Sequence, residues 1–199
     1  MVKCWNSQLN NMILVPELYV FAGCNGAGKS TLIEHYGQAF DIIVNPDLIA
    51  KQLNPGDPRS ADLSAGKEAI RRIRDCLDRR NSFAVETTLS GQYVIKQMAA
   101  ARALGYRVYF YYIGLQNVQM HIDRVRTRVL EGGHYIAPAD IIRRYAVSLR
   151  NMKAALWQAD VSVILDNSRD EYDILLEMEY GKTTYRAVLL PSWFDGLDL

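Results

Sequence analysis

The stretch FAGCNGAGKSTL, residues 21–32, places three glycines, one lysine and two hydroxyl side chains directly after a short apolar run. Glycine loses more backbone entropy on folding than any other residue, so this cluster requires a reason. Residues 23–30 match the pattern G-x-x-x-x-G-K-[ST] at every fixed position. In that pattern, glycines allow backbone amides to approach phosphate oxygens closely. The stretch therefore predicts a phosphate-binding loop, with a structural glycine turn as the competing interpretation.

The same loop predicts how a nucleotide and its metal would be held. Lys29 is expected to reach the β- and γ-phosphates, and Ser30 is expected to coordinate Mg²⁺. Cys24 is interpreted as a small residue that fills the loop rather than as a reactive thiol. The residues expected to bind ATP are Gly23, Cys24, Asn25, Gly26, Ala27, Gly28, Lys29, Ser30 and Thr31.

Composition is typical of a globular protein. The 199 residues are 49% hydrophobic and 23% charged, and the formal net charge is +1. This length suits one domain over residues 1–199, and the charge favours neither nucleic acid nor a membrane as partner. Three widely spaced cysteines predict neither a disulfide framework nor a zinc site, which indicates a cytoplasmic protein. No apolar run suffices to span a bilayer, and residues 1–17 lack the apolar segment of a signal peptide.

Apolar periodicity and breaker residues predict alternating strands and helices. Strands are expected at 18–23, 41–47, 82–88, 106–115 and 161–167, and a hairpin at 171–190 with its turn near Tyr180–Gly181. Residues 1–16 are expected to form an irregular arm and residues 51–62 a loop. Helices are expected from Gly28 to Gly37, from a Ser64 cap, over 92–103, from an Asn117 cap to 131, and from Pro138 to about 158. This alternation predicts an α/β three-layer sandwich around a mainly parallel five-stranded sheet, followed by the antiparallel hairpin.

Polar residues end several of the predicted strands. In an open α/β sheet, ligands bind beyond the carboxyl ends of the strands, so these residues are expected to converge near the loop. Asp47 is the candidate general base that takes a proton from an acceptor hydroxyl, and its competing role is a helix cap. The segments concerned are Asn45-Pro46-Asp47, Glu86-Thr87-Thr88 and Asp166-Asn167-Ser168.

Glu86 interrupts an otherwise apolar strand, where an unpaired buried charge would be costly. A metal, a bound water or a substrate hydroxyl would offset that cost, and an arginine partner is the competing interpretation. Glu86 is therefore a candidate metal ligand together with Ser30. The candidate substrate-binding residues are Asp47, Glu86, Thr87 and Thr88.

Arginines bracket a glycine-hinged loop in the segment HIDRVRTRVLEGGHYIAPADIIRRY, residues 121–145. Arg124 and Arg128 lie one helical turn apart, and Arg143 and Arg144 follow the loop. Such an arrangement predicts a helical lid over about 126–145 that closes over a triphosphate and stabilises charge on the transferring phosphoryl group. The competing interpretation is a pair of exposed helix ends with weak ion pairs. His134, in the loop, is interpreted as incidental to substrate binding.

A second basic run falls off the apolar stripe of the helix expected after Ser64. It contains Arg71, Arg72, Arg74, Arg79 and Arg80. This pattern is typical of a solvated helix face, and contact with nucleic acid is the minor alternative.

Six motifs, in order between about Tyr19 and Ser168, resemble the zeta toxin family of P-loop kinases: GCNGAGKSTL, VNPDLIA, VETTLSG, DRVRTRVLEGGHYI, IIRRY and LDNS. The resemblance implies a P-loop kinase-like fold, the use of ATP and Mg²⁺, and a small antitoxin as partner. It also implies transfer of the γ-phosphoryl group to a hydroxyl of a sugar nucleotide such as UDP-N-acetylglucosamine.

The resemblance further implies roles for individual residues. Asp47 resembles the base, Lys29 the phosphate ligand and Ser30 the metal ligand. Glu86 and Thr87 resemble ligands of the substrate or of metal-bound water. The lid arginines would be Arg124 or Arg128, together with Arg143 or Arg144.

Two other functions stay open at this point. The first is a P-loop kinase with a different acceptor, such as a nucleoside, a sugar, an NAD-like molecule or a nucleic-acid end. The second is a non-catalytic switch that binds ATP and a partner protein.

Overall fold

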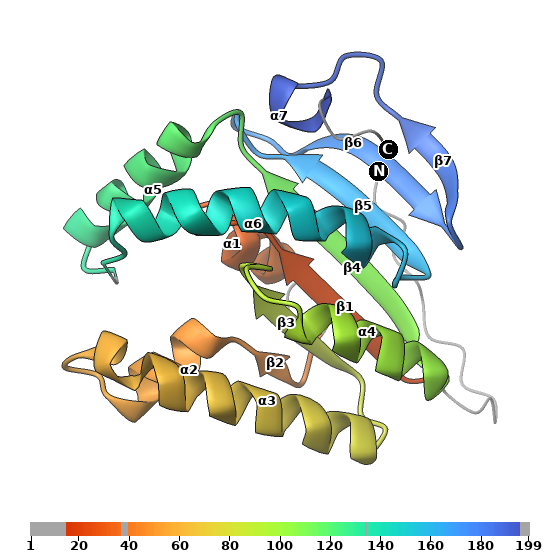
Figure 1. Cartoon of the computed structure of the whole chain (residues 1–199), viewed down its shortest axis with the longest axis horizontal. Helices are drawn as coiled ribbons and strands as arrows, with labels where there is room; N and C mark the ends of the chain where they lie inside the picture. The colour runs from red at the N-terminus through yellow and green to blue at the C-terminus, as the bar shows by residue number, and fades with distance from the viewer. Residues whose placement is uncertain (1–14, 37–39, 134, 196–199) are drawn as a thin grey trace.

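The apolar run before the glycine-rich loop forms strand β1 (Glu17–Ala22), which lies inside a seven-stranded sheet. The computed structural model describes residues 15–36, 40–133 and 135–195. Within them the strand order is β2-β3-β1-β4-β5-β6-β7 (Figure 1). Residues 20–22 are fully buried, as expected for a strand with both faces covered. Most of the predicted arm, residues 1–14, lies outside the described residues, as do Gly37 and His134.

Five strands run parallel, which confirms the predicted core of the sheet. Strand β1 pairs in parallel with β3 and β4, β3 pairs with β2, and β4 pairs with β5. After β1 the chain runs to the edge strand β2 and returns to β3 beside β1, and it then continues on the other side of β1 through β4 and β5. A topological switch point therefore lies beside β1, at the carboxyl ends of the strands. The other strand bounds are β2 (Ile43–Val44), β3 (Phe83–Thr87), β4 (Arg107–Gly114) and β5 (Val161–Asp166).

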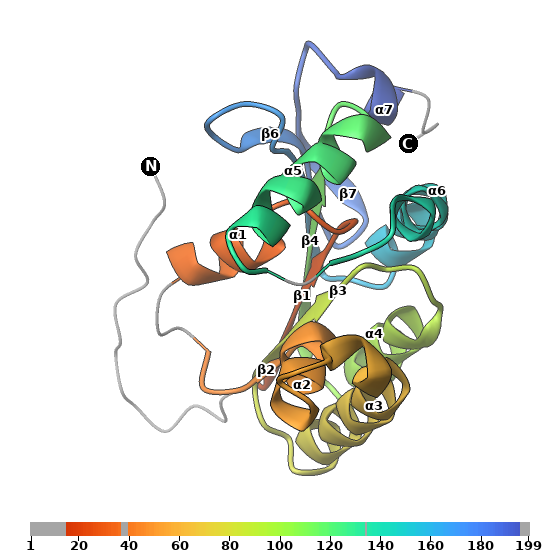
Figure 2. The same cartoon turned by 90° about the vertical axis from the view of Figure 1, so that its left-hand side faces the viewer.

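Helices lie on both sides of the sheet, which confirms the three-layer arrangement. Figure 2 shows α1 on one side and α3, α4 and α6 on the other. Among the described helices, none is long and apolar enough to cross a bilayer. The helix bounds are α1 (Lys29–His35), α2 (Pro46–Leu53), α3 (Asp62–Asp78), α4 (Tyr93–Ala103), α5 (Val118–Leu130), α6 (Pro138–Leu156) and α7 (Ser192–Asp195).

The C-terminal part of the sheet is an antiparallel hairpin, as predicted. Strand β6 (Asp173–Glu179) pairs with β5, and β7 (Lys182–Arg186) pairs with β6. Tyr180 and Gly181 form the turn with φ of 49° and 75°, the left-handed conformation that a tight hairpin turn of this kind requires. All five residues of β7 are exposed, and this strand is the edge of the sheet.

Predictions for residues 41–64 are wrong in part. Strand β2 has two residues instead of seven, and helix α2 begins at Pro46 and reaches into the stretch predicted as a loop. Proline fits the first helical position because its missing amide would have no partner there. A 3₁₀ turn, η2 (Pro58–Ala61), leads directly into α3, so that helix starts at Asp62 and Ser64 does not cap it.

Candidate nucleotide-binding and phosphoryl-transfer site

The glycine-rich stretch folds into a tight loop between β1 and α1. Gly23, Gly26 and Gly28 have φ of 146°, 77° and 97°, conformations that residues with a side chain rarely adopt. A Cβ at Gly23 would overlap the Ile113 carbonyl oxygen, and one at Gly28 would overlap the Asn167 amide nitrogen. Backbone strain and lack of space therefore both require glycine at these two positions.

The loop leaves a set of backbone amides without partners. The amide of Ala27 donates to the Cys24 carbonyl oxygen at 3.2 Å, which closes a turn within the loop. Within the described part of the chain, the amides of Gly26, Gly28, Lys29 and Ser30 donate to no other group. Consecutive free amides of this kind form a concave site for anions.

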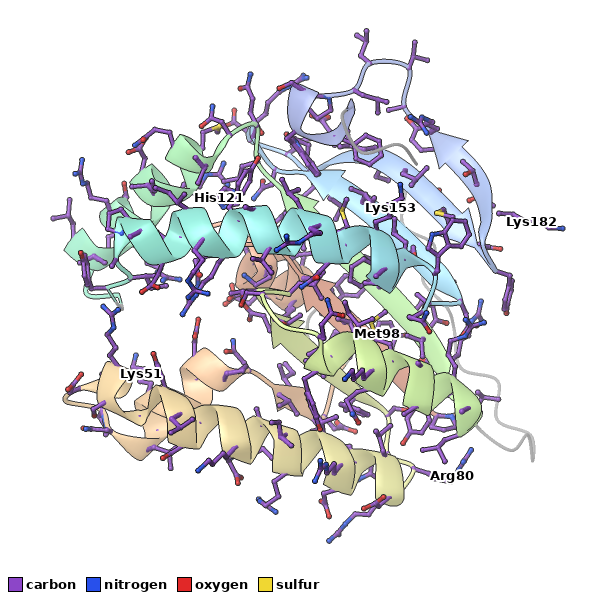
Figure 3. The ribbon with its side chains drawn as sticks, in the orientation of Figure 1. Lys51, Arg80, Met98, His121, Lys153 and Lys182 are labelled. Atoms are coloured by element: carbon purple, nitrogen blue, oxygen red, sulfur yellow. The ribbon has the colours of Figure 1, made fainter. Side chains whose placement is uncertain are left out.

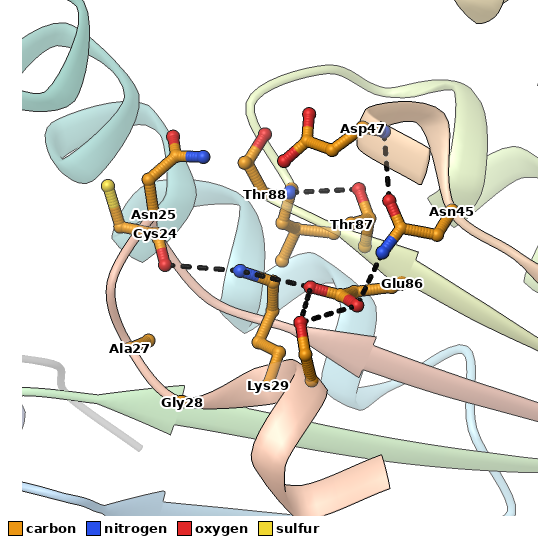
Figure 4. Close-up of polar contacts among 12 residues, drawn as sticks. Cys24, Asn25, Ala27, Gly28, Lys29, Asn45, Asp47, Glu86, Thr87 and Thr88 are labelled. Carbon is orange, nitrogen blue, oxygen red and sulfur yellow. Dashed lines mark hydrogen bonds and ion pairs between the residues drawn. The ribbon is translucent and has the colours of Figure 1, made fainter. Parts of the chain in front are cut away.

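A buried polar cluster joins the loop to the tips of two strands (Figure 4). The Glu86 carboxylate, at the end of β3, accepts hydrogen bonds from Ser30 Oγ at 3.1 Å and from Asn45 Nδ2 at 2.7 Å. Lys29 Nζ lies 3.8 Å from Glu86 Oε1 and donates to the Cys24 carbonyl oxygen at 3.2 Å. Lys29 is 6% exposed and Glu86 9%, so each charge compensates the other in the interior. The cationic partner of Glu86 is a lysine, so the arginine interpretation is wrong.

A cavity of about 210 Å³ lies beside Lys29 and Glu86. It brings together all four candidate substrate-binding residues and adds residues from η2, α3 and α6. Its lining residues are Lys29, Asn45, Pro46, Asp47, Arg59, Asp62, Glu86, Thr87, Thr88, Ser90, Tyr135, Ile136, Asp140 and Arg144. Hydroxyl, carboxylate and guanidinium groups together suit a polar ligand that both donates and accepts hydrogen bonds.

Asp47 lies in the first turn of α2 and faces this cavity. The helix is capped by Asn45, whose Oδ1 accepts from the amides of Asp47 at 2.8 Å and Leu48 at 3.2 Å. The interpretation of Asp47 as the cap is therefore wrong. Its carboxylate is exposed, and no described side chain donates to it.

The loop after β3 is held by an unusual backbone conformation. Leu89 has φ of 54° although it is fully buried. Its amide donates to Thr87 Oγ1 at 3.0 Å, and its carbonyl oxygen accepts from Asn151 Nδ2 on α6 at 2.8 Å. These bonds fix the turn that presents Thr87 and Thr88 to the cavity, since strained conformations persist only where the surroundings determine them.

The four predicted lid arginines occupy different environments. Arg144 lines the cavity and donates to Asn25 Oδ1 at 3.0 Å, and Arg124 donates to the Asn167 carbonyl oxygen at 2.7 Å. Arg143 is on the surface, where it donates to Asp140 at 3.2 Å. The Arg128 side chain packs against Gly133. The structure thus brings Arg124 and Arg144 to the phosphate loop and leaves Arg143 outside it.

Sequence reasoning missed an ion pair at the cavity. Arg59 Nη2, from η2, lies 3.0 Å from Asp140 Oδ2 on α6. Arg59 belongs to the stretch predicted as a loop, and the two partners are 81 positions apart in the sequence. No local sequence pattern reports a contact over such a separation.

His121, on α5, is a second missed residue (Figure 3). It is 1% exposed, its ring lies 5.3 Å from that of Tyr145, and its Nδ1 donates to the Asn25 carbonyl oxygen at 2.9 Å. Nδ1 bears the proton because a carbonyl oxygen only accepts. Burial, together with the charges of Lys29 and Arg124, lowers the pKa of His121 to about 4, although the hydrogen bond to Asn25 acts in the opposite direction. The imidazole is therefore neutral near pH 7.

Three arginines of the basic run form ion pairs along α3. Arg71 and Arg72 both contact Glu68, at 2.7 and 2.8 Å, and Arg79 contacts Asp75 at 2.8 Å. This pairing favours the solvated helix face over contact with nucleic acid.

The chain has a P-loop kinase-like fold, and solved structures share it. A chain of the crystal structure of AvrRxo1-ORF1:-ORF2 with ATP matches 85% of this chain with a TM-score of 0.67 and 16% identity. This chain spans only 60% of the length of that one.

Two further solved structures share this fold. One, from the PezAT chromosomal toxin–antitoxin system of Streptococcus pneumoniae, has a TM-score of 0.60 and 17% identity, over 82% of this chain and 72% of that one. A putative kinase from Chloroflexus aurantiacus has a TM-score of 0.53 and 14% identity, over 69% and 79%. At sequence identities this low, these similarities show only that the fold is shared.

Sequence comparison places the chain in a family. No family model matches it. It is 39% identical over 125 residues to an uncharacterized protein of Haemophilus influenzae (strain ATCC 51907 / DSM 11121 / KW20 / Rd), and the match covers 63% of this chain and 89% of that relative. The chain belongs to the same family as this Haemophilus influenzae protein.

The buried histidine predicts a loss of stability in mild acid. The pKa of His121 is about 4 in the folded state against an ordinary value of 6.5, so the unfolded state binds the proton first. Stability from this group is complete above pH ~6.5 and decreases as the pH falls toward ~4. The groups that face the ring or its partner Asn25 are Lys29, Arg124, Arg144 and Tyr145. The three cations repel a protonated imidazole and the tyrosine is neutral, so none of these groups stabilises the protonated form.

Urea unfolding at about pH 7 and about pH 5 tests this expectation. The free energy of unfolding should decrease by about 2 kcal/mol more in the native protein than in His121→Phe, which has no imidazole to protonate. Equal decreases in both proteins would contradict it.

Proposed function

We propose that the protein is an ATP- and Mg²⁺-dependent kinase of the zeta toxin type, with a sugar nucleotide such as UDP-N-acetylglucosamine as acceptor. The observation behind the proposal is the loop at residues 23–31 with the free amides of Gly26, Gly28, Lys29 and Ser30, which adjoins a polar cavity that Asp47 lines. The resemblance of the sequence motifs to zeta toxins points to the same reaction. The fold shared with a structure solved with ATP supports the choice of nucleotide.

In this proposal the free amides and Lys29 bind the triphosphate. Lys29 Nζ is close to the loop and to Glu86, so a small side-chain movement transfers it to the phosphate oxygens. Ser30 Oγ and the Glu86 carboxylate are hard oxygen ligands of the kind that Mg²⁺ prefers. Bound Mg²⁺ would supply neutralisation of the phosphate charge. The described residues contain no group of three His, Cys, Asp or Glu side chains suited to a metal, and Mg²⁺ at nucleotide sites usually has only one or two protein ligands.

The acceptor hydroxyl would lie in the cavity, between Asp47 and the phosphate loop. Asp47 accepts its proton, since its carboxylate has no competing donor in the described structure. Thr87, Thr88 and Ser90 add hydroxyl groups to the cavity wall, and Thr88 Oγ1 lies 2.9 Å from Ser90 Oγ. Hydroxyl and carboxylate walls suit an acceptor with several hydroxyl groups.

Arg124 and Arg144 stabilise charge on the transferring phosphoryl group in this scheme. Both already contact residues of, or next to, the phosphate loop. Closure of the predicted lid, residues 126–145, would add Arg128 or Arg143 and exclude water from the site.

A small antitoxin protein is the proposed partner. Support comes from the resemblance to zeta toxins and from the fold shared with a toxin–antitoxin system. Toxicity on expression, relieved by a neighbouring gene product, would test this part separately.

Replacement of the proposed base separates binding from chemistry. Asp47→Asn should bind MgATP as the native protein does, because Asp47 contacts the acceptor and not the nucleotide. Phosphoryl transfer should decrease about 100-fold or more, the usual contribution of a general base. Calorimetry with MgATP and transfer of labelled γ-phosphate to UDP-N-acetylglucosamine measure the two quantities. Transfer at the native rate would show that Asp47 is not the base.

The acceptor is tested with the same labelled ATP and a pool of metabolites. Label on UDP-N-acetylglucosamine would support the proposal. Label on a nucleoside, a sugar, an NAD-like molecule or a nucleic-acid end would show that this molecule is the acceptor instead. Tight binding of MgATP without transfer to any of them would indicate a nucleotide-dependent switch.

Removal of the loop lysine should abolish tight nucleotide binding. Lys29→Met is expected to weaken MgATP binding at least tenfold, since a charge-assisted contact to phosphate contributes about 1.5–3 kcal/mol. It also leaves the buried Glu86 carboxylate without its cation, so the variant should unfold more easily.

The double variant Lys29→Met/Glu86→Gln separates these two effects. It should recover much of the lost stability, because the unpaired charge is gone, while nucleotide binding stays weak. Recovery of native affinity in the double variant would show that Lys29 does not contact the phosphates.

A further inference from the structure

We infer that His121, Asn167 and Tyr172 are positioning residues, which hold carbonyl groups of the phosphate loop outward and thereby aim its free amides at the bound phosphates. The inference deepens the proposed function and rests on it for the identity of the anion. These three side chains lie outside the loop motif and come from three different segments of the chain.

Each of the three donates to a different carbonyl oxygen of the loop. His121 Nδ1, on α5, lies 2.9 Å from the Asn25 oxygen, and Asn167 Nδ2, just after β5, lies 2.9 Å from the Ala27 oxygen. The Tyr172 hydroxyl, just before β6, donates to the Gly28 oxygen at 2.8 Å.

Peptide geometry connects these bonds to the free amides. In a trans peptide unit the carbonyl and the following N–H point in opposite directions, and every described peptide bond is trans. A carbonyl of Asn25 held toward α5 therefore turns the Gly26 amide away from α5. In the same way, a carbonyl of Ala27 held toward Asn167 turns the Gly28 amide away from the β5 tip. Both amides belong to the unpaired set.

The two principal contacts are protected from competition by water. His121 is 1% exposed and Asn167 9%, and Arg124 fixes the Asn167 backbone through its carbonyl oxygen. Hydrogen bonds in such surroundings are stronger than on the surface. Among the described residues His121 Nε2 has no hydrogen-bond partner, so Nδ1 is the only ring nitrogen that orients the side chain.

Of the three side chains, Tyr172 contributes least to the orientation of the loop. The Gly28 carbonyl oxygen also accepts the first helical bond of α1, from the Leu32 amide at 3.0 Å, and that bond alone aligns it. We therefore expect His121 and Asn167 to matter most. The contact of Tyr172 still links the segment before the C-terminal hairpin to the phosphate loop.

A pair of substitutions at His121 separates positioning from packing. His121→Asn keeps a donor at the same distance along the side chain and removes the ring, whereas His121→Phe keeps a ring and removes the donor. If His121 positions the loop, His121→Phe should weaken MgATP binding about tenfold, the value of one buried hydrogen bond, and His121→Asn should retain most of the affinity. Asn167→Leu, which removes the second donor, should weaken it similarly.

The matched control is Tyr106→Phe. The Tyr106 hydroxyl also donates to carbonyl oxygens, in a buried contact to Cys76 at 2.9 Å and a partly buried one to Asn81 at 3.1 Å, and neither residue belongs to the loop. This variant should lose stability and keep native affinity for MgATP. Native affinity in His121→Phe, or equal losses in His121→Phe and His121→Asn, would overturn the inference.

Amide resonances test the inference without any nucleotide. In the free protein, the Gly26 and Gly28 ¹H–¹⁵N signals should shift or broaden in His121→Phe and Asn167→Leu, and the Gly26 signal should stay close to native in His121→Asn. Unchanged signals in the first two variants would overturn it. If the native protein bound no MgATP, the proposed function would fail, and these signals would still decide whether the side chains orient the loop.

Discussion

The buried carboxylate of Glu86 is the contact on which the geometry of the site depends. It bonds to the first residues of α1 through Lys29 and Ser30, and to the cap of α2 through Asn45. A carboxylate at a strand end is stable in the interior only with such partners. The same bonds therefore compensate a buried charge and fix the relative positions of the phosphate loop, the tip of β3 and the helix that presents Asp47.

The phosphate loop is also part of the interior that joins α5 and α6. Cys24 packs with Val125, Ile136 and Ile141, and its Sγ lies 3.5 Å from the Ile141 carbonyl oxygen. Burial raises the pKa of the Cys24 thiol, which agrees with a residue that fills space in the loop. Because loop and helices share this cluster, a rotation of α5 or α6 would displace the loop backbone as well.

The sequence was sufficient to predict features with a local signal. The apolar run before residue 23, the glycine spacing and the alternation of strands and helices led to the parallel sheet and the loop. A helix after Asp47 was only an alternative interpretation, because Pro46 and the prolines after it suggested a break, although Pro46 is compatible with a helix start. The roles of Arg59 and His121 could not be predicted from the sequence, because their contacts join residues that are 81 and 96 positions apart. Only the tertiary fold creates these contacts.

The exposed edge of β7 affects how two copies of the chain could associate. An edge strand with unpaired backbone groups is a template for association and aggregation between molecules. Here Lys182 and Arg186 lie at its two ends (Figure 3 marks Lys182), so two copies aligned antiparallel would place like charges opposite each other. Electrostatic repulsion thus discourages continuation of the sheet from one molecule into the next, and it leaves this edge selective for a strand of opposite charge.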